Sequence, residues 1–377
     1  MTIDTARPSV FLLIGQLGLG GAEYQVTLLA KGLLAQGVKV SVGVLFERGP
    51  HARTLSELGI PVTHLGFQRG AKPVRNAAAF AGLVRHLRRE RPAIMHAHLP
   101  PAHLLGVPAA RLAGVPVVVA TLHTLDRYLR GRRWLAPVDR RAHKLCHHLF
   151  AVSAAVERFA VGRMGVPAHL VQVVHNGVPG EAFAAVFPAD VQADGPVLVS
   201  VGNLNAHKGH CHLLDAAALL RNAGRPCTVV LVGDGPERER LREQAAALRV
   251  DVRFAGHQPD VRAWLARADV VVMPSLSESL GIAAVEAMAA MRPVVASEVG
   301  GLPELLRYRG VLVPPANATA LADGIAWVLA HPAQARQLAL EARIWSGTHL
   351  RADAMVDTYL AAYRRLAGWE NTHAVAH

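Results

Sequence analysis

The sequence has few cysteines and no long apolar segment. Cysteine occurs three times in 377 residues, far apart and never as a Cys-x-x-Cys pair. This pattern argues against a disulfide framework and against a zinc knuckle. The apolar run from Val10 to Ile14 is too short for a signal peptide or a membrane span, and no basic segment precedes it. This run predicts a strand. The cysteine pattern favours a protein of the reducing cytoplasm.

Charged residues are also scarce, at 18% of the chain, whereas apolar residues make up 51% and no low-complexity tract occurs. Such a composition excludes a disordered protein. A chain of 377 residues exceeds the usual size of a single core. We therefore expect two globular domains of about 150 to 190 residues each.

Negative charge is scarce in the first half of the chain. Residues 1–187 carry 22 Lys and Arg against 9 Asp and Glu, whereas residues 188–377 carry 18 against 19. The asymmetry predicts an anionic partner for the first half, although a solubilising surface charge explains it equally well. Seven of the cations lie within residues 127–144, so this segment is either a solvated helix face or a patch for an anionic membrane surface or a phosphorylated acceptor. We expect no nucleic-acid partner.

Apolar β-branched runs alternate with longer helical patterns, and the alternation restarts near residue 196. The first series includes SVFLLIG, VKVSVGVLF and VPVVVATLH, and the second includes PVLVSVGNL, CTVVLVGDG and ADVVVMPS. Consecutive apolar positions indicate parallel strands that helices cover on both faces. We predict an α/β protein with two Rossmann-like domains, 1–180 and 181–355, and a final helix over 356–370. This helix packs either back on the first domain or on the second, and periodicity does not decide between them. Ligands of such sheets bind beyond the carboxyl ends of the strands, so we expect the site in the cleft between the domains.

Two glutamates begin and end the segment ESLGIAAVE, which follows an apolar strand. The pattern places Glu278 in a loop and Glu286 on a helix. If this helix begins near Leu280, the amides of Leu280, Gly281 and Ile282 form an anion site. Carboxylates accept hydrogen bonds from vicinal hydroxyls, so we predict that the pair brackets a sugar-linked diphosphate. A helix-dipole role explains Glu278 about as well.

Two further loops of the second domain carry candidate residues. The segment VGNLNAHKGH places Lys208 after a strand, where a lysine can bind phosphate, but the Gly-Lys-Ser/Thr order of a P-loop is absent. The segment LVGDGPERERL is a strand followed by a tight turn at Gly233. An ordinary turn explains this second segment well on its own.

The first domain has a glycine-rich loop, LGLGGAEYQ, that narrowly misses the dinucleotide fingerprint, because Glu23 stands where a third glycine is expected. Gly21 still lets a substrate approach the backbone. His98 and His123 end two strands, where ligand-binding residues belong. His-x-His can bind a metal, but no third ligand is evident and Asp-x-Asp occurs nowhere in the chain, so we expect no metal.

Taken together and in order, a set of motifs over nearly the whole chain resembles the family 4 glycosyltransferases, the large retaining family with the GT-B fold. The motifs are GGAE, HAH, TLH, HNGV, VGNLNAHKG, GDGPER, FAG, SESLGIAAVEAMA and RPVVASEVGGLPEL. The resemblance implies two facing Rossmann-like domains, the second for a nucleotide-sugar and the first for much of the acceptor, with no metal or other cofactor. It implies transfer of a hexose, from UDP on family frequency, to a glycan, a lipid-linked or a small-molecule acceptor, typical of cell-envelope polysaccharide synthesis. A peripheral position at the inner face of the membrane is predicted instead from the basic first half and the segment 127–144.

The resemblance also implies roles for single residues. Glu278 resembles the glutamate near the transferred sugar, and Glu286 resembles the one that grips the ribose. Lys208 resembles the lysine that neutralises the leaving diphosphate. His123 is similar to the histidine beside the reacting carbon, and Gly21 to the loop glycine beside the diphosphate.

The remaining candidates complete the donor and acceptor sites. Asn203 stands where the family often has an arginine, and we expect weaker assistance to the leaving group from this difference. Asn203 and Gly233 are predicted to contact the donor, and Glu23 and His98 the acceptor. Two other enzyme classes stay open: a nucleotide-sugar epimerase or hydrolase of the same fold, and an NAD-dependent oxidoreductase, which Glu47 at a strand end favours and the glycine spacing opposes.

Overall fold

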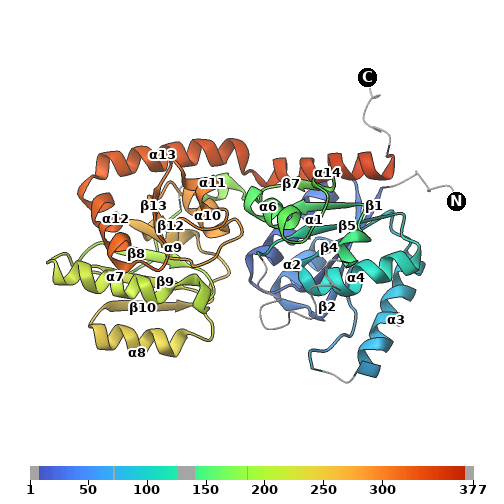
Figure 1. The fold of residues 1–377 in the computed structure, drawn as a ribbon, viewed down its shortest axis with the longest axis horizontal. Coiled ribbons are helices and arrows are strands. Elements are labelled where there is room, and N and C mark those ends of the chain that lie inside the picture. Colours follow the sequence, from blue (N-terminus) through green and yellow to red (C-terminus); the bar gives the residue numbers. More distant parts are fainter. Residues whose placement is uncertain (1–7, 71–72, 126–140, 185, 370–377) are drawn as a thin grey trace. The chain divides into compact units, whose positions relative to one another are not determined.

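The computed structural model describes residues 8–70, 73–125, 141–184 and 186–369. The chain divides into two compact units, one of Met1–Asn176 with Ala352–His377 and the other of Gly177–Arg351. The boundary between them falls a few residues before position 181. Each unit contains a parallel sheet with its own helices (Figure 1), so the predicted architecture of two parallel-sheet α/β domains is confirmed.

In the described residues, the first unit has a seven-stranded sheet with the order β3-β2-β1-β4-β5-β6-β7, and every pairing is parallel. The strands β1 and β4 are buried on both faces because helices cover both sides. The elements of this unit are β1 (Ser9–Gln16), α1 (Gly21–Ala35), β2 (Lys39–Glu47), α2 (Gly49–Glu57), β3 (Val62–His64), α3 (Pro73–Glu90), β4 (Ile94–His98), α4 (Leu99–Ala113), β5 (Val117–Leu122), β6 (His148–Ala151), α6 (Ala154–Gly162), the 3-10 helix η2 (Ala168–Leu170), β7 (Val171–Val173) and α14 (Ala352–Ala367).

The final helix, α14, belongs to the first unit and packs against α1 (Figure 1). Its apolar face, which includes Tyr359 and Tyr363, is buried in the same core as β1 and α1. The two helices approach closely at Gly32, where a Cβ would lie 2.5 Å from Cγ2 of Val356. Any larger side chain at this position would push α14 away from the sheet.

In the described residues, the second unit has a six-stranded parallel sheet with the order β10-β9-β8-β11-β12-β13. Its core combines the strands with α7 and α12. The elements of this unit are η3 (Gly180–Phe183), β8 (Val197–Val201), η4 (Ala206–Lys208), α7 (His210–Asn222), β9 (Thr228–Val232), α8 (Arg238–Leu248), β10 (Asp251–Gly256), α9 (Arg262–Arg267), β11 (Val270–Met273), α10 (Ile282–Ala289), β12 (Val294–Ser297), α11 (Leu302–Leu306), β13 (Val311–Val313), α12 (Ala318–Ala330) and α13 (Pro332–His349).

The strand order reverses once in each sheet, between β1 and β4 in the first unit and between β8 and β11 in the second. Such a reversal opens a crevice beyond the carboxyl ends of the two strands, and this is where open parallel sheets bind ligands. The loops that follow β8 and β11 carry Lys208 and Glu278, and His98 ends β4. The topology therefore places the candidate residues at the ligand-binding edge of each sheet.

Candidate functional site

Backbone hydrogen bonds join the loops that follow β8 and β9. The amide of Gly202 donates to the carbonyl of Val232 and the amide of Leu204 to that of Asp234, both at 2.9 Å. Gly233 lies where the loops meet, with a φ of 144° that favours glycine. A Cβ at this residue would lie 2.1 Å from the carbonyl oxygen of Gly202. Gly233 is therefore needed for the close packing of the loops, and a direct contact with a donor stays a prediction.

Lys208 and Glu278 form an ion pair between the loops that follow β8 and β11. Nζ of Lys208 lies 2.6 Å from Oε2 of Glu278, and the two side chains are only 20% and 13% exposed. The hydroxyl of Ser275 donates to the same carboxylate oxygen at 3.3 Å. Burial, and next the charge of Lys208, lower the pKa of His210 to about 3, so this neighbouring ring is neutral. The fold thus brings together two predicted site residues that are 70 positions apart, and their catalytic roles stay predictions.

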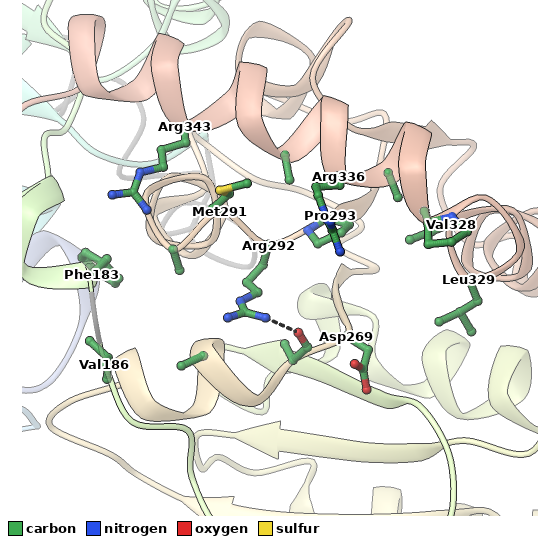
Figure 2. A pocket seen from close by; sticks show the side chains of 16 residues that line it. Phe183, Val186, Asp269, Met291, Arg292, Pro293, Val328, Leu329, Arg336 and Arg343 are labelled. Carbon is green, nitrogen blue, oxygen red and sulfur yellow. Dashed lines mark hydrogen bonds between the residues drawn. The ribbon is translucent and has the colours of Figure 1, made fainter.

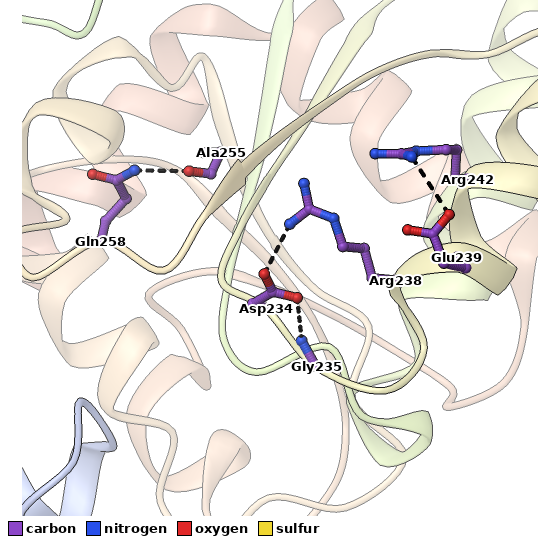
Figure 3. A network of polar contacts seen from close by, with 7 residues as sticks. All are labelled: Asp234, Gly235, Arg238, Glu239, Arg242, Ala255 and Gln258. Carbon is purple, nitrogen blue, oxygen red and sulfur yellow. Dashed lines mark hydrogen bonds and ion pairs between the residues drawn. The ribbon is translucent and has the colours of Figure 1, made fainter. Parts of the chain in front are cut away.

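The turn after β9 is held by its own side chains. Asp234 accepts a hydrogen bond from the amide of Gly235 at 2.7 Å and pairs with Arg238 at 2.9 Å (Figure 3). The hydrogen bond from Gly235 is the main cause that lowers the pKa of Asp234, and Arg238 adds to it. These contacts explain Asp234 and Arg238 of the segment GDGPER as groups that stabilise the turn.

The helix that carries Glu286 begins later than predicted. α10 starts at Ile282, with Gly281 as its N-cap residue, so the predicted start near Leu280 is wrong. The reason is Gly281, whose φ of 96° lies outside the helical region. Leu280 instead buries its side chain in the core, with 1% exposed. An anion at this helix would therefore meet the amides that begin at Ile282 rather than that of Leu280.

Gly281 also packs closely between Glu278 and Leu302. A Cβ on Gly281 would lie 3.3 Å from Cγ of Glu278 and 2.6 Å from Cδ2 of Leu302. The amide of Gly301 donates to the carbonyl of Glu278 at 3.3 Å, which ties the loop after β12 to the loop after β11. The start of α10 and the carboxylate of Glu278 are thus neighbours, as the predicted anion site requires.

Glu286 is the fifth residue of α10 and is partly buried. Burial raises the pKa of its carboxyl group from 4.5 to about 8, and the negative charge of Asp260 contributes in the same direction. At neutral pH the side chain is therefore mostly a neutral acid. A neutral carboxyl group donates one hydrogen bond and accepts others, which suits two adjacent hydroxyl groups. Its predicted contact with a ribose stays a prediction.

In the first unit, Glu23 lies in the first turn of α1 and folds back on the start of that helix. A Cβ on Gly20, the N-cap residue, would lie 2.3 Å from Oε2 of Glu23. Burial raises the pKa of Glu23, and hydrogen bonds from its own amide and from Gln16 offset part of that effect. A carboxylate here satisfies amides that a helix start leaves free. Glu23 thus has a structural role beside Gly21, the first residue of α1, and its acceptor role stays a prediction.

His98 and His123 meet at the ends of β4 and β5. Nδ1 of His98 lies 3.0 Å from Nε2 of His123, and the two residues are 2% and 9% exposed. Burial lowers both pKa values, that of His123 to about 4, so both rings are neutral at pH 7. Nε2 of His98 is buried and has no hydrogen-bond partner among the described residues. A histidine pair with one free ring nitrogen can bind a hydroxyl group, which fits the predicted sugar and acceptor contacts without testing them.

The chain turns directly from β4 into α4 behind His98. Leu99 makes this turn with a φ of 71°, a left-handed conformation that costs a non-glycine residue about 1–2 kcal/mol. Strained residues of this kind cluster at binding sites, because the surrounding structure must hold them in place. The strain at Leu99 therefore agrees with a functional position for the end of β4.

A second set of buried hydrogen bonds lies next to the histidine pair, where the rings of His96 and His98 are 3.9 Å apart between centroids. The carbonyl of Thr121 accepts from Nε2 of His103 at 3.0 Å, so the neutral His103 ring accepts at Nδ1 from His143 at 3.2 Å. His96 bonds the hydroxyls of Thr121 and Tyr363 at 2.7 and 2.5 Å. The hydroxyl of Tyr363 thus connects α14 to β4. These bonds fix the histidine rings against hydroxyl and ring partners, and the described residues contain no group of three or more His, Cys, Asp or Glu arranged to hold a metal.

One predicted surface, the basic segment, lies mainly outside the residues that the structure describes. The basic segment 127–144 lies outside the described residues except for its last four positions, of which Arg141 and Lys144 are exposed. Its contact with an anionic membrane therefore stays a prediction. A cytoplasmic location also stays a prediction. Among the described helices, none is long and apolar enough to cross a membrane.

Three residues of the site were not among the residues predicted from the sequence. Ser275 contacts Glu278, Asp260 acts on the Glu286 carboxyl group, and Tyr363 contacts His96. Asp260 and Tyr363 come from distant parts of the chain, so spacing could not reveal them. Ser275 lies three residues before Glu278, and the Ser-rich loop PSLSES was the one local hint.

Two family models and several known proteins match the chain. Residues 19–181 match the family model described as Glycosyltransferase Family 4, and residues 195–331 match the one described as Glycosyl transferases group 1. The chain is 32% identical to a 2-deoxystreptamine glucosyltransferase of Streptomyces kanamyceticus, over 92% of this chain and 100% of that protein. It is 30% identical to a D-inositol 3-phosphate glycosyltransferase of Streptomyces bingchenggensis, over 92% of this chain and 86% of that protein.

Solved structures show the same fold. The structure of Anabaena HepE with UDP and glucose matches with a TM-score of 0.83 at 23% identity, over 94% of this chain and 99% of that one. Sucrose-phosphate synthase of Thermosynechococcus elongatus matches with a TM-score of 0.79 at 21% identity, over 97% of this chain and 100% of that one. The predicted GT-B fold is confirmed, and the matches favour a glycosyltransferase over the dehydrogenase alternative.

Proposed function

Because the chain belongs to the family 4 glycosyltransferases, we propose that it transfers a hexose from a UDP-sugar to a hydroxyl group, with retention at the anomeric carbon and without a metal ion. The name of the glucosyltransferase relative supports a hexose, and the UDP and UDP-glucose bound to HepE support UDP as its carrier. The observation that carries the proposal is the ion pair of Lys208 and Glu278 beside the start of α10.

The donor is assigned to the carboxyl edge of the second sheet. The Lys208 ammonium group lies 2.6 Å from Glu278 and is the cation that we assign to the diphosphate at the start of α10. Binding of the diphosphate would compete with Glu278 for this ammonium group and free the carboxylate to accept hydrogen bonds from the sugar hydroxyls. Glu286 would bind the ribose hydroxyls from the next turns of the helix.

The chemistry follows from where charge develops. The bond between the anomeric carbon and the β-phosphate oxygen breaks, and negative charge grows on the departing phosphate. Lys208 and the amides from Ile282 onward stabilise that charge electrostatically. The acceptor oxygen forms the new bond on the same face of the sugar, and its proton passes to the departing phosphate. This route needs no covalent intermediate with the enzyme.

The acceptor is assigned to the first unit, which carries His98 and His123. The relatives named above act, by their names, on 2-deoxystreptamine and inositol 3-phosphate. These names support a small polyhydroxylated ring as the acceptor, among the glycan, lipid-linked and small-molecule classes that the family implies. The free Nε2 of His98 would then accept from, or donate to, an acceptor hydroxyl.

A transfer assay with purified protein tests the proposal. Hexose sugars on UDP, GDP, ADP and dTDP are offered with inositol 3-phosphate, 2-deoxystreptamine and oligosaccharide acceptors, and products are identified by mass and by NMR. We expect turnover with a UDP-hexose, an α-linked product from an α-linked donor, and unchanged turnover after treatment with EDTA. A β-linked product would refute retention, and loss of activity on chelation that Mg²⁺ restores would refute metal independence.

The reaction without an acceptor separates the alternative activities. A transferase should consume the donor slowly when no acceptor is present. Rapid formation of free hexose or of an epimeric nucleotide-sugar would instead indicate a hydrolase or an epimerase. Lys208→Ala shows whether any donor consumption comes from this site. It removes the proposed leaving-group cation at a partly exposed position, so consumption at the site should fall.

A further inference from the structure

A pocket opens in the second unit at the edge of the sheet opposite to the candidate donor site. It has a volume of about 600 Å³, within the range typical of sites for small organic ligands. Asp269, which precedes β11, and Pro293, which precedes β12, lie in its wall. The candidate donor residues follow the carboxyl ends of strands β8 and β11, so the two sites lie at opposite edges of one sheet.

The wall of the pocket is mostly apolar but carries three arginines, Arg292, Arg336 and Arg343, against one acid, Asp269 (Figure 2). Arg336 and Arg343 are seven residues apart on α13, two helical turns, so they project from the same face of that helix. The apolar lining comes from side chains of η3, α12 and the loop after α10, among them Phe183, Val328, Leu329 and Met291.

The three guanidinium groups lack carboxylate partners. Among the described residues, none of them forms an ion pair, whereas arginines such as Arg238 and Arg262 of the same unit do. Arg292 donates through one terminal nitrogen to the carbonyl of Ala268 at 3.3 Å (Figure 2). Its Nε is buried and has no hydrogen-bond partner in the part of the chain that the structure describes. A buried N–H group without a partner is costly, and an anion in the pocket would satisfy it.

The loop that carries Arg292 is strained as well. Met291 has a φ of 54°, the left-handed conformation that non-glycine residues rarely adopt. Burial lowers the pKa of the Arg292 guanidinium group, and Asp269 offsets part of that effect. Both observations show a segment that is held in an unfavourable environment, which is common where a protein forms a ligand site.

We propose that this pocket is a second ligand site and that it binds a small organic phosphomonoester. The arginines match the phosphate group, because a planar guanidinium group binds two phosphate oxygens at once. The apolar wall matches an organic body of a size that about 600 Å³ can hold. The site is separate from the proposed donor site and does not depend on the proposed reaction.

Calorimetric titration of the full chain with phenyl phosphate tests the proposal. We expect saturable binding that Arg336→Gln and Arg343→Gln each weaken about tenfold, since each removes a charged donor. Both side chains lie on the outer helix α13, so these variants keep the fold even where Arg292→Gln does not. Arg225→Gln, on the exposed loop after α7, is the matched control and should leave the affinity unchanged.

Two further titrations separate this pocket from the donor site. Lys208→Ala should leave phenyl phosphate binding unchanged, whereas loss of binding in this variant would assign the ligand to the donor site and overturn the proposal. Inorganic phosphate and phenol should each bind at least tenfold more weakly than phenyl phosphate, because each makes only part of the contacts. Equal affinity for inorganic phosphate, or binding that none of the arginine variants changes, would also overturn it.

Discussion

Replacing Glu286 with glutamine should stabilise the protein, and the gain should grow as the pH rises. The carboxyl group has a pKa of about 8 in the folded chain against 4.5 in the unfolded chain, so the folded state holds the proton more tightly. The stability that this protonated group contributes is fully present below pH 4.5. It is lost progressively as the pH rises toward 8. Glutamine stays neutral and escapes this loss.

The size of the effect follows from the difference between the two pKa values. A shift from 4.5 to about 8 corresponds to about 4 to 5 kcal/mol when the folded carboxyl group is ionised. Because Glu286 is only partly buried, solvent screens some of this energy. We expect Glu286→Gln to add about 2 kcal/mol at pH 8 and about 0.5 kcal/mol at pH 5. For a unit of this size, 2 kcal/mol raises the melting temperature by about 4 to 8 °C.

Differential scanning calorimetry at pH 5, 6, 7 and 8 measures the effect in the unfolding transition of the second unit. Glu243→Gln is the matched control, because it makes the same chemical change at an exposed position on α8. Its melting temperature should follow the unchanged protein at every pH. A Glu286→Gln gain that does not depend on pH, or a lower melting temperature at pH 8, would contradict a raised pKa of the carboxyl group in the folded protein and refute the reasoning.

Three further predictions concern the loops of the second sheet. Lys208→Ala should lower kcat by about 10²- to 10³-fold with a smaller change in KM, measured in the transfer assay, and an unchanged kcat would exclude Lys208 from leaving-group stabilisation. Gly233→Ala should cost more than about 2 kcal/mol in chemical denaturation, because its Cβ would meet the Gly202 carbonyl, whereas Gly162→Ala, which has open space around it, should cost nothing. Asn203→Arg should raise kcat about three- to tenfold by adding a cation to the exposed loop after β8, and a lower kcat would contradict weak leaving-group assistance in this chain.

The alternation of strands and helices was readable from the sequence because it depends on local patterns. Buried parallel strands require consecutive apolar β-branched residues, and runs such as VVVMP meet that requirement. The start of α10 was misplaced because a glycine at position 281 is compatible both with a helix interior and with the positive φ of an N-cap. Sequence alone does not distinguish these two conformations.

The sequence identified most residues of the candidate site, but it did not show which of these residues contact one another. Lys208 and Glu278 were each placed after a strand, and only the sheet order shows that these two strands are neighbours. The contact of Tyr363 with His96 joins residues 267 positions apart, and no spacing rule indicates such a pair. The pKa of Glu286 depends on burial and on Asp260, which are properties of the packed structure.

The two glutamates of the segment ESLGIAAVE differ chemically despite their matching positions. Glu278 is ion-paired with Lys208, whereas Glu286 is mostly neutral at pH 7 because of its raised pKa. If the neutral acid is the form that binds the donor, Glu286→Gln should keep donor affinity within about threefold, since an amide also donates and accepts, while Glu286→Ala should lose about 10- to 100-fold. Titration calorimetry with UDP at pH 7 distinguishes the cases. Equal losses in both variants would mean that the ionised carboxylate binds the donor, and the donor would then have to lower the pKa of Glu286 on binding.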